Sequence, residues 1–309
     1  MIDNFLIVAQ QVAVLFVLMG FGAVMRWAKF FQDNAIEGFV NVLILVVTPC
    51  LIVDVFQRPF DPAMLKGLGL AFGFAVLLHL LLIVLSWTMV RHRNEDVRRP
   101  LVLAAAMSNA GYMGIPLEQA VLGDAGVFFG IVYVVVFNLV IWSWGLKTMS
   151  GGVSRLKMWV NPGTVGVALG APLFFCSAKL PEVVGVPVRH LANLNTPLAM
   201  IVIGHCLAGA SFGKVLRTGS VYAAAAVRLV ACPLLVVAAL YPFRHALERN
   251  MMLAMAVAAS APVAAMVSMF AAKFRRDVDV AVSVVTGTTL LSILTMPVAI
   301  AFAMAMLSD

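Results

Sequence analysis

Three asparagines could bind a solute, because each lies inside an apolar stretch of the sequence. Asn109 lies seven residues before Pro116, so two helical turns place both residues on one helix face. Its amide could donate to a substrate carboxylate, or it could satisfy backbone carbonyls that the proline frees. Asn195 lies beside Pro197, where solute binding and capping of a broken helix are the alternatives. For Asn138, midway along another apolar stretch, the alternatives are solute binding and a hydrogen bond to a neighbouring helix.

Three basic side chains also lie in apolar stretches. Arg228 is the costliest, because a charge about 11 positions inside a span of roughly 25 residues is rare and usually functional. Pairing with free carbonyls at a helix break is the alternative. His79 and His205 are each expected to be hydrogen-bonded core residues, with proton coupling as the alternative role.

Prolines interrupt apolar segments in matched pairs, one member in each half of the chain. Pro116 pairs with Pro262, 146 residues later, and Pro49 pairs with Pro197, 148 residues later. A proline inside a helix frees backbone carbonyls, which a bilayer tolerates only where protein or a water-filled cavity satisfies them. These four prolines are therefore predicted to mark helix breaks. Breaks at corresponding positions of two halves indicate a secondary transporter with its site at the breaks.

The composition indicates a membrane protein. Of 309 residues, 63% are hydrophobic and only 11% are charged, and the mean hydropathy is +1.03. A soluble domain is less apolar and carries about 25% charged residues. Basic residues stand singly or in small groups between apolar runs, which is typical of cytoplasmic loops and excludes a nucleic-acid-binding face. The four cysteines lack metal-ligand spacing, so neither a metal site nor a cofactor is expected.

The apolar stretches predict an all-α fold of ten membrane-spanning helices. A first five-helix repeat is expected over residues 1–147, a short cytoplasmic linker over 148–160, and a second, inverted repeat over 161–309. The first span is read as an uncleaved helix, because MIDN gives it no basic leader. The predicted spans are residues 5–27, 35–56, 64–90, 100–121, 125–147, 161–177, 188–211, 217–241, 250–271 and 279–306.

The distribution of basic residues predicts the orientation in the membrane. With both termini outside, fourteen lysines and arginines lie in cytoplasmic loops and six in outer loops. Five spans in each half then place the second half upside down relative to the first. The expected location is a bacterial-type inner membrane with periplasmic termini, and whether the chain forms a homodimer is left open.

A motif around Pro116 resembles that of a known family. Asn109 followed by Met113-Gly114-Ile115-Pro116-Leu117 resembles the N-x-x-x-MGIPL break of the auxin efflux carrier family, which includes the plant PIN carriers and bacterial relatives. Shorter similarities extend along the chain, among them Arg26-Trp27, Asn161-Pro162, Arg228 with Pro233, and Met296-Pro297-Val298. The plant carriers with a long cytosolic loop have it where this chain has only about residues 148–160.

The resemblance implies two inverted repeats whose fourth and ninth helices cross at their breaks, with the substrate bound beside the crossing. The partly positive N-terminal ends of half-helices suit an organic anion, such as an auxin-like monocarboxylate or a malonate-like dicarboxylate. The residues after Pro262 differ from the plant pattern, so auxin itself is not specified. The residues expected at the site are Asn109, Gly114, Pro116, Asn138, Asn195, Arg228 and Pro262.

Alternatives to a carrier of organic anions are weakened by what the sequence lacks. Apart from Glu37 and Asp279 at the beginnings of two spans, Asp54 and Glu118 are the only acids inside predicted spans, and both are expected toward the outer end, which disfavours a proton pump built on buried carboxylates. No catalytic motif appears, which weakens an integral-membrane enzyme. A sodium-coupled symporter of the bile-acid type would be expected to show more polar oxygens than Ala259-Ser260-Ala261-Pro262 offers. A receptor without transport stays open.

Overall fold

The computed structural model describes residues 2–30, 33–57, 59–60, 62–151, 162–209 and 219–307, and it is 86% helical. Helical segments occupy all ten predicted ranges as far as these are described, whereas most of the predicted linker and residues 210–218 lie outside the described residues. Within the described residues, seven helices are long and apolar enough to cross a membrane: Ala9–Trp27, Gly38–Phe56, Lys66–Met89, Ala110–Ser150, Glu182–Ala208, Gly219–Phe243 and Val278–Leu307.

Among the described residues, the first half of the chain contains three helices of 26 residues or more and the second half contains one. A single glycine, Gly123, divides α6 with a φ of 66°, a backbone conformation that favours glycine because it has no Cβ. The elements are α1 (Ile2–Trp27), α2 (Asp33–Val42), η1 (Leu43–Val47), α3 (Thr48–Phe56), α4 (Pro62–Met89), α5 (Glu95–Ala106), η2 (Ala110–Gly114), α6 (Ile115–Val140), η3 (Ile141–Gly145) and α7 (Leu146–Ser150).

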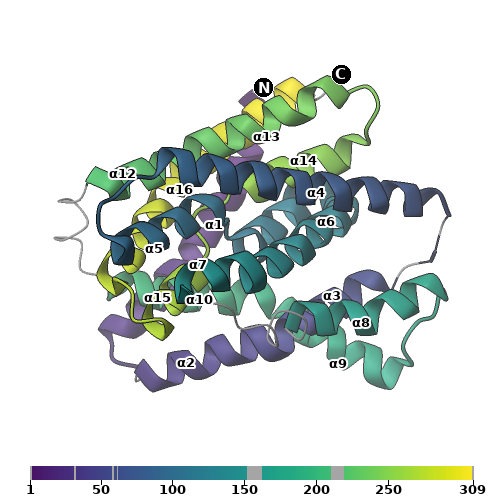
Figure 1. Ribbon diagram of the computed structural model, residues 1–309. Helices are drawn as coiled ribbons and strands as arrows, with labels where there is room; N and C mark the ends of the chain where they lie inside the picture. The colour runs from purple at the N-terminus through teal and green to yellow at the C-terminus, as the bar shows by residue number, and fades with distance from the viewer. Residues whose placement is uncertain are drawn as a thin grey trace.

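The second half is similar in design but has shorter pieces. Its elements are α8 (Pro162–Phe175), α9 (Glu182–Asn193), α10 (Asn195–Ala208), α12 (Gly219–Ala226), η4 (Val227–Ala231), α13 (Cys232–Leu240), η5 (Tyr241–Phe243), α14 (Arg249–Ser260), α15 (Met266–Lys273) and α16 (Val278–Leu307). In Figure 1, α3, α8 and α9 form a group at one corner, and the long α4 runs across the remaining bundle.

The centre of the bundle is formed by α5 and α14, whose C-terminal halves are apolar and rich in alanine. Leu101 to Ala106 on α5 and every residue from Met251 to Ser260 on α14 are buried. Surrounding helices expose large apolar side chains, for example Val84 on α4 and Leu294 on α16. This pattern suits a protein whose outer surface contacts lipid, where backbone groups must be satisfied within helices.

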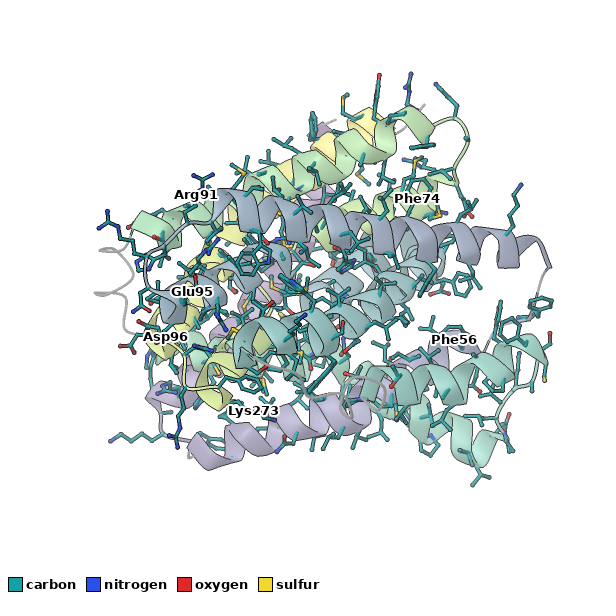
Figure 2. The ribbon with its side chains drawn as sticks, in the orientation of Figure 1. Phe56, Phe74, Arg91, Glu95, Asp96 and Lys273 are labelled. Carbon is teal, nitrogen blue, oxygen red and sulfur yellow. The ribbon has the colours of Figure 1, made fainter. Side chains whose placement is uncertain are left out.

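Charged side chains gather at one end of the bundle, where α5 begins and α15 ends (Figure 2). Arg91, Glu95, Asp96 and Lys273 all lie at this end. An ion pair between Arg276 and Asp96 joins the beginning of α5 to the connection between α15 and α16. Because α5 starts where α15 stops, the two broken helices run through the bundle in opposite directions.

Candidate functional site

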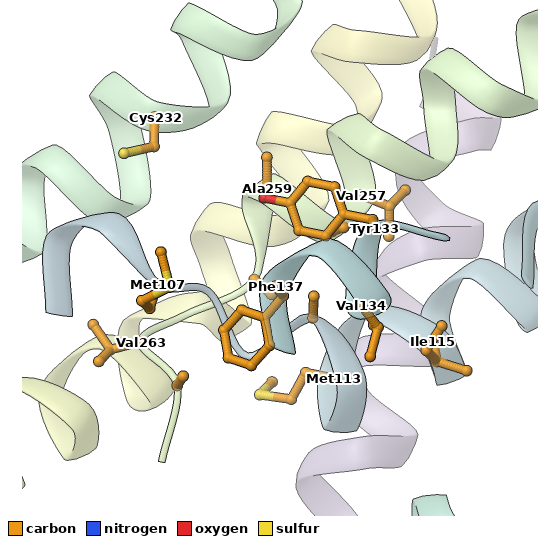
Figure 3. Close-up of a cluster of buried hydrophobic side chains, with 14 of the residues drawn as sticks. Met107, Met113, Ile115, Tyr133, Val134, Phe137, Cys232, Val257, Ala259 and Val263 are labelled. Atoms are coloured by element: carbon orange, nitrogen blue, oxygen red, sulfur yellow. The ribbon is translucent and has the colours of Figure 1, made fainter. Parts of the chain in front are cut away.

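The two central helices break where their extended backbones cross. Residues 107–109 separate α5 from η2, and residues 261–265 separate α14 from α15. The crossing is antiparallel, with Ser108 opposite Val263. The Asn109 N–H donates to the Pro262 carbonyl at 2.7 Å, and the Ala264 N–H donates to the Met107 carbonyl at 3.0 Å. Figure 3 shows Met107 and Val263, one from each break, close to each other.

The first break lies seven residues before Pro116 rather than at Pro116, which corrects the expected position. Three prolines, at positions 49, 116 and 233, instead lie two residues after a π-helix within a continuous helix. A proline has no N–H to donate, and its ring displaces the carbonyl one turn back, so the chain widens locally into a π-turn. Pro197 lies near the beginning of α10, and of these prolines Pro262 alone lies in a non-helical break.

Arg228 binds the C-terminal ends of both half-helices that meet at the crossing. One terminal nitrogen (Nη1) of its fully buried guanidinium donates to the carbonyls of Ala105 and Ala106 at 3.3 and 3.1 Å, and the other (Nη2) donates to the carbonyl of Ala259. Helix C-termini carry partial negative charge and unsatisfied carbonyls, so a cation is stabilised there. Pairing with carbonyls at a helix break therefore accounts for this arginine.

The two N-terminal ends face the opposite way, toward a cavity of about 70 Å³. Its lining includes the beginnings of both second half-helices, at residues 108–112 and 264–266. The first N–H groups of a helix have no intrahelical acceptor, and they carry the equivalent of about half a positive charge. The other lining residues are Ile44, Thr48, Val134, Phe137, Asn138, Trp142, Pro162 and Gly163.

Asn109 and Asn138 are brought together in this cavity. Asn109 is 5% exposed, and its side-chain amide has no hydrogen-bond partner among the described residues. The Asn138 amide donates to the Val134 carbonyl at 2.8 Å, one turn earlier in its own helix. The cavity thus contains an amide free to donate, between two helix ends of positive polarity, and none of the described residues that line it is charged. Such an arrangement can hold a carboxylate.

Asn195 and Pro116 lie in a second, larger cavity of about 560 Å³, which we call the outer vestibule. Its lining includes the ion pair between Asp54 and Arg189, whose closest atoms are 3.6 Å apart. The Asn195 amide donates to the Gly111 carbonyl at 3.3 Å. In the i to i−5 pattern of η2, the Gly111 carbonyl would accept a hydrogen bond from the backbone N–H of residue 116. Because residue 116 is proline and has no N–H, the Asn195 amide supplies the donor instead. It also joins the vestibule wall to the wall of the 70 Å³ cavity.

A third cavity of about 310 Å³, mainly apolar, shares Ile44, Tyr112, Ala265 and Met266 with the small one. Arg26, at the end of α1, lines it as well. The small cavity therefore lies next to an apolar space on one side, and its wall is linked through Asn195 to the polar vestibule on the other.

Three further expected site residues line neither the small cavity nor the outer vestibule. Arg228 is bound to backbone as described, and Gly114 packs against Ala258 of α14. Pro262 contributes its carbonyl to the crossing. Sequence reasoning did not single out Tyr112, Thr48 or Trp142, which line the cavity, although Tyr112 lies within the quoted motif. The His79 ring donates from Nδ1 to the Ala75 carbonyl, 2.7 Å away, as a core histidine would.

Glu118 is the other departure from the expected arrangement. The sequence suggested a carboxylate toward the outer end of a span, whereas the structure buries this side chain completely. Neither carboxylate oxygen has a hydrogen-bond partner among the described residues.

The fold and the crossing define a multi-pass membrane protein built around two broken helices, which is a design of membrane carriers. The sequence model of the membrane transport protein family matches residues 7–157 and 150–300. The chain therefore belongs to this family, the auxin efflux carrier family, and it is a membrane transporter. No curated protein sequence matches the chain significantly.

Proposed function

We propose that the protein is a secondary carrier, not an enzyme, and that it moves a small organic anion by alternating access. The anion binds in the 70 Å³ cavity beside the crossing. The observation that carries the proposal is the arrangement of charge there: two helix N-termini and the free Asn109 amide face the cavity, while Arg228 neutralises the two C-termini behind it. Mono- and dicarboxylates such as an auxin-like acid or malonate are the substrate classes that fit this polarity.

The proposal includes ten membrane-crossing segments in two inverted five-helix repeats. Gly123 divides the long stretch Ala110–Ser150 into two, and the described elements then group into five segments before residue 152 and five after residue 161. An antiparallel crossing of two broken helices that run in opposite directions supports a two-fold axis in the membrane plane. Basic residues are in excess at the end of the bundle where Arg91 and Lys273 lie, and this excess supports a cytoplasmic location for that end. Both termini would then lie on the periplasmic side of an inner membrane.

A solute screen in proteoliposomes tests this function. Purified protein is reconstituted, and uptake of radiolabelled mono- and dicarboxylates is measured at zero membrane potential and at potentials of both signs. We expect saturable uptake of at least one carboxylate. If transport moves net charge, the direction of anion accumulation should reverse when the sign of the membrane potential is reversed. A potential of 100 mV changes accumulation by about 50-fold per charge, equivalent to about 2.3 kcal/mol. Saturable transport of neutral or cationic solutes alone would contradict an anion site.

A further inference from the structure

Glu118 has surroundings that no part of the anion site explains. Its side chain is 0% exposed, and both carboxylate oxygens lack a hydrogen-bond partner among the described residues. Gly130, on the part of α6 beyond the Gly123 kink, leaves the space that the carboxyl group fills, because a Cβ there would overlap the carboxylate. Gly114 lies on its other side, so that a Cβ at that position would be 3.8 Å from Oε1.

The groups that face Glu118 supply no positive charge in contact with it. Tyr133, on the second part of α6, interacts electrostatically with Glu118, but no hydrogen bond joins the two side chains. From α14, the neutral Ala258 packs beside Gly114. Other titratable residues lie behind Tyr133 or in the outer vestibule: His79 of α4, Arg228 of η4, Cys232 of α13, Asp54 of α3 and Asp124 of α6. Figure 3 shows Tyr133 projecting toward α14 near Ala259.

An ionised carboxylate in this place would be out of contact with bulk solvent and without a counter-charge from the described residues. Burying such a charge unpaired costs far more than binding a proton, so the neutral acid is the stable form. A bound metal cation is not supported, because the described residues contain no group of three or more His, Cys, Asp or Glu side chains that could hold one. Proton binding satisfies the carboxyl group without any further ligand.

Glu118 also lies on a segment that has a non-helical joint at each end. Residues 110–122 run between two joints, the extended break at 107–109 and the left-handed Gly123. Pro116 and Gln119 on this segment line the outer vestibule, and they flank Glu118 in the sequence. A tilt of the segment away from Gly130 would carry the carboxyl group to the vestibule water.

We propose that Glu118 is a proton-binding site through which protonation from the outer vestibule controls anion transport. When the segment tilts outward, a vestibule water (as hydronium) donates one proton to a carboxylate oxygen, which becomes neutral. The segment can then pack against Gly130 as described here. Reopening returns the proton to water and leaves the carboxylate ionised, so that each passage between the two conformations involves one proton. This inference rests on the proposed function for its coupling to an anion, but the proton site itself does not.

Infrared spectroscopy of the purified protein tests the protonation directly. At pH 7 we expect the wild type to show the C=O band of a protonated carboxylic acid, shifted in heavy water, and we expect Glu118→Gln to lack it. The matched control Glu182→Gln removes an exposed acid on α9 and should leave the band unchanged. If Glu118→Gln does not insert, Glu118→Leu provides an apolar replacement of similar size. A wild type without this band would overturn the proton site.

Transport measurements then test the coupling. Above the pH at which Glu118 titrates, the wild-type rate should fall by up to about tenfold per pH unit, since one proton is linked to the step. Glu118→Gln should transport the anion at a rate independent of pH. A pH profile that is the same in wild type and mutant would overturn the coupling even with the band present. The band in a protein that transports no carboxylate would support the proton site while contradicting the proposed function.

Discussion

The two sides of the crossing handle charge in opposite ways. On one side, the carbonyl ends of α5 and α14 receive a full positive charge from the buried Arg228 guanidinium. On the other, the N–H ends of η2 and α15 face a small cavity that contains amides but no charged side chain. The buried Arg228 therefore satisfies the carbonyl ends of two helices, and the N–H ends on the other side have no such charged partner among the described residues.

The largest expected effect comes from removing the charge on the carbonyl side. Arg228→Met should lower the free energy of unfolding by about 3 kcal/mol or more, because each buried carbonyl left without a donor costs about 1–3 kcal/mol. Thermal and denaturant unfolding in detergent measure this. An Arg228→Met protein that keeps wild-type stability and loses only substrate affinity would contradict this role, since that result would place the arginine in the binding site.

The two prolines of the broken segments should differ, although the sequence pairs them. Pro262→Ala restores an N–H within the crossing and lets α14 continue, so transport should fall by about tenfold or more in a folded protein. Pro116→Ala only returns a donor that can compete with Asn195 for the Gly111 carbonyl, and transport should stay within about twofold. Initial uptake rates in proteoliposomes check both variants. Equal losses in the two variants would show that Pro116 is part of the crossing after all.

A smaller effect is expected from the helix that supports the second break. The Val263 N–H donates to the Thr288 hydroxyl of α16 at 3.2 Å, and this holds the extended backbone of residues 261–265 in place. Thr288→Val keeps the shape but removes the acceptor, so the unfolding free energy should fall by about 1 kcal/mol. Thr289→Val is the matched control, because that hydroxyl donates within its own helix. A loss as large in the control would indicate a general effect on α16.

The smallest effect concerns charges that lie in water rather than in the bundle. Hydrogen bonds from Arg99 and then Arg98 hold the pKa of Glu95 below its ordinary value of 4.5. The stabilisation of the folded protein by these bonds is therefore present above pH 4.5, and it is lost as the pH falls through the lowered pKa of Glu95. Because these side chains are partly exposed and screened, Glu95→Gln should cost only a few tenths of a kcal/mol. A loss comparable to that of Arg228→Met would contradict the distinction between buried and exposed charge.

The helices and the membrane class could be predicted from the sequence because apolar length alone determines them. Helical segments lie where the apolar stretches are, and the motif around Gly114 leads to the family. Asn109 and Asn138 were also found, since a polar side chain in an apolar stretch is visible in the sequence. Their meeting in one cavity was implied only by the family resemblance.

Positions that depend on three-dimensional pairing were harder to predict. A proline signals a disturbed helix, but the sequence does not say whether the result is a π-turn, as before Pro116, or a full break, as at Pro262. The cost of burying Arg228 shows that it needs partners, whereas the carbonyls of α5 and α14 become visible as those partners only in the fold. The burial of Glu118 depends on Gly130, which approaches it because of the Gly123 kink.

Anion binding by Asn109 variants tests directly whether the cavity beside the crossing binds an organic anion through the Asn109 amide. Calorimetry on purified protein, with malonate and indole-3-acetate as probes, should show at least one of them binding to the wild type. Asn109→Ala should weaken that binding by about 5–30-fold, equivalent to about 1–2 kcal/mol, with little change in thermal stability. Asn109→Asp should be weaker still, because a carboxylate in the cavity repels the anion. The control Asn94→Asp adds the same charge at the N-cap of α5, outside the cavity, and should bind normally. An Asn109→Asp protein that binds the anion as tightly as wild type at neutral pH would contradict the account.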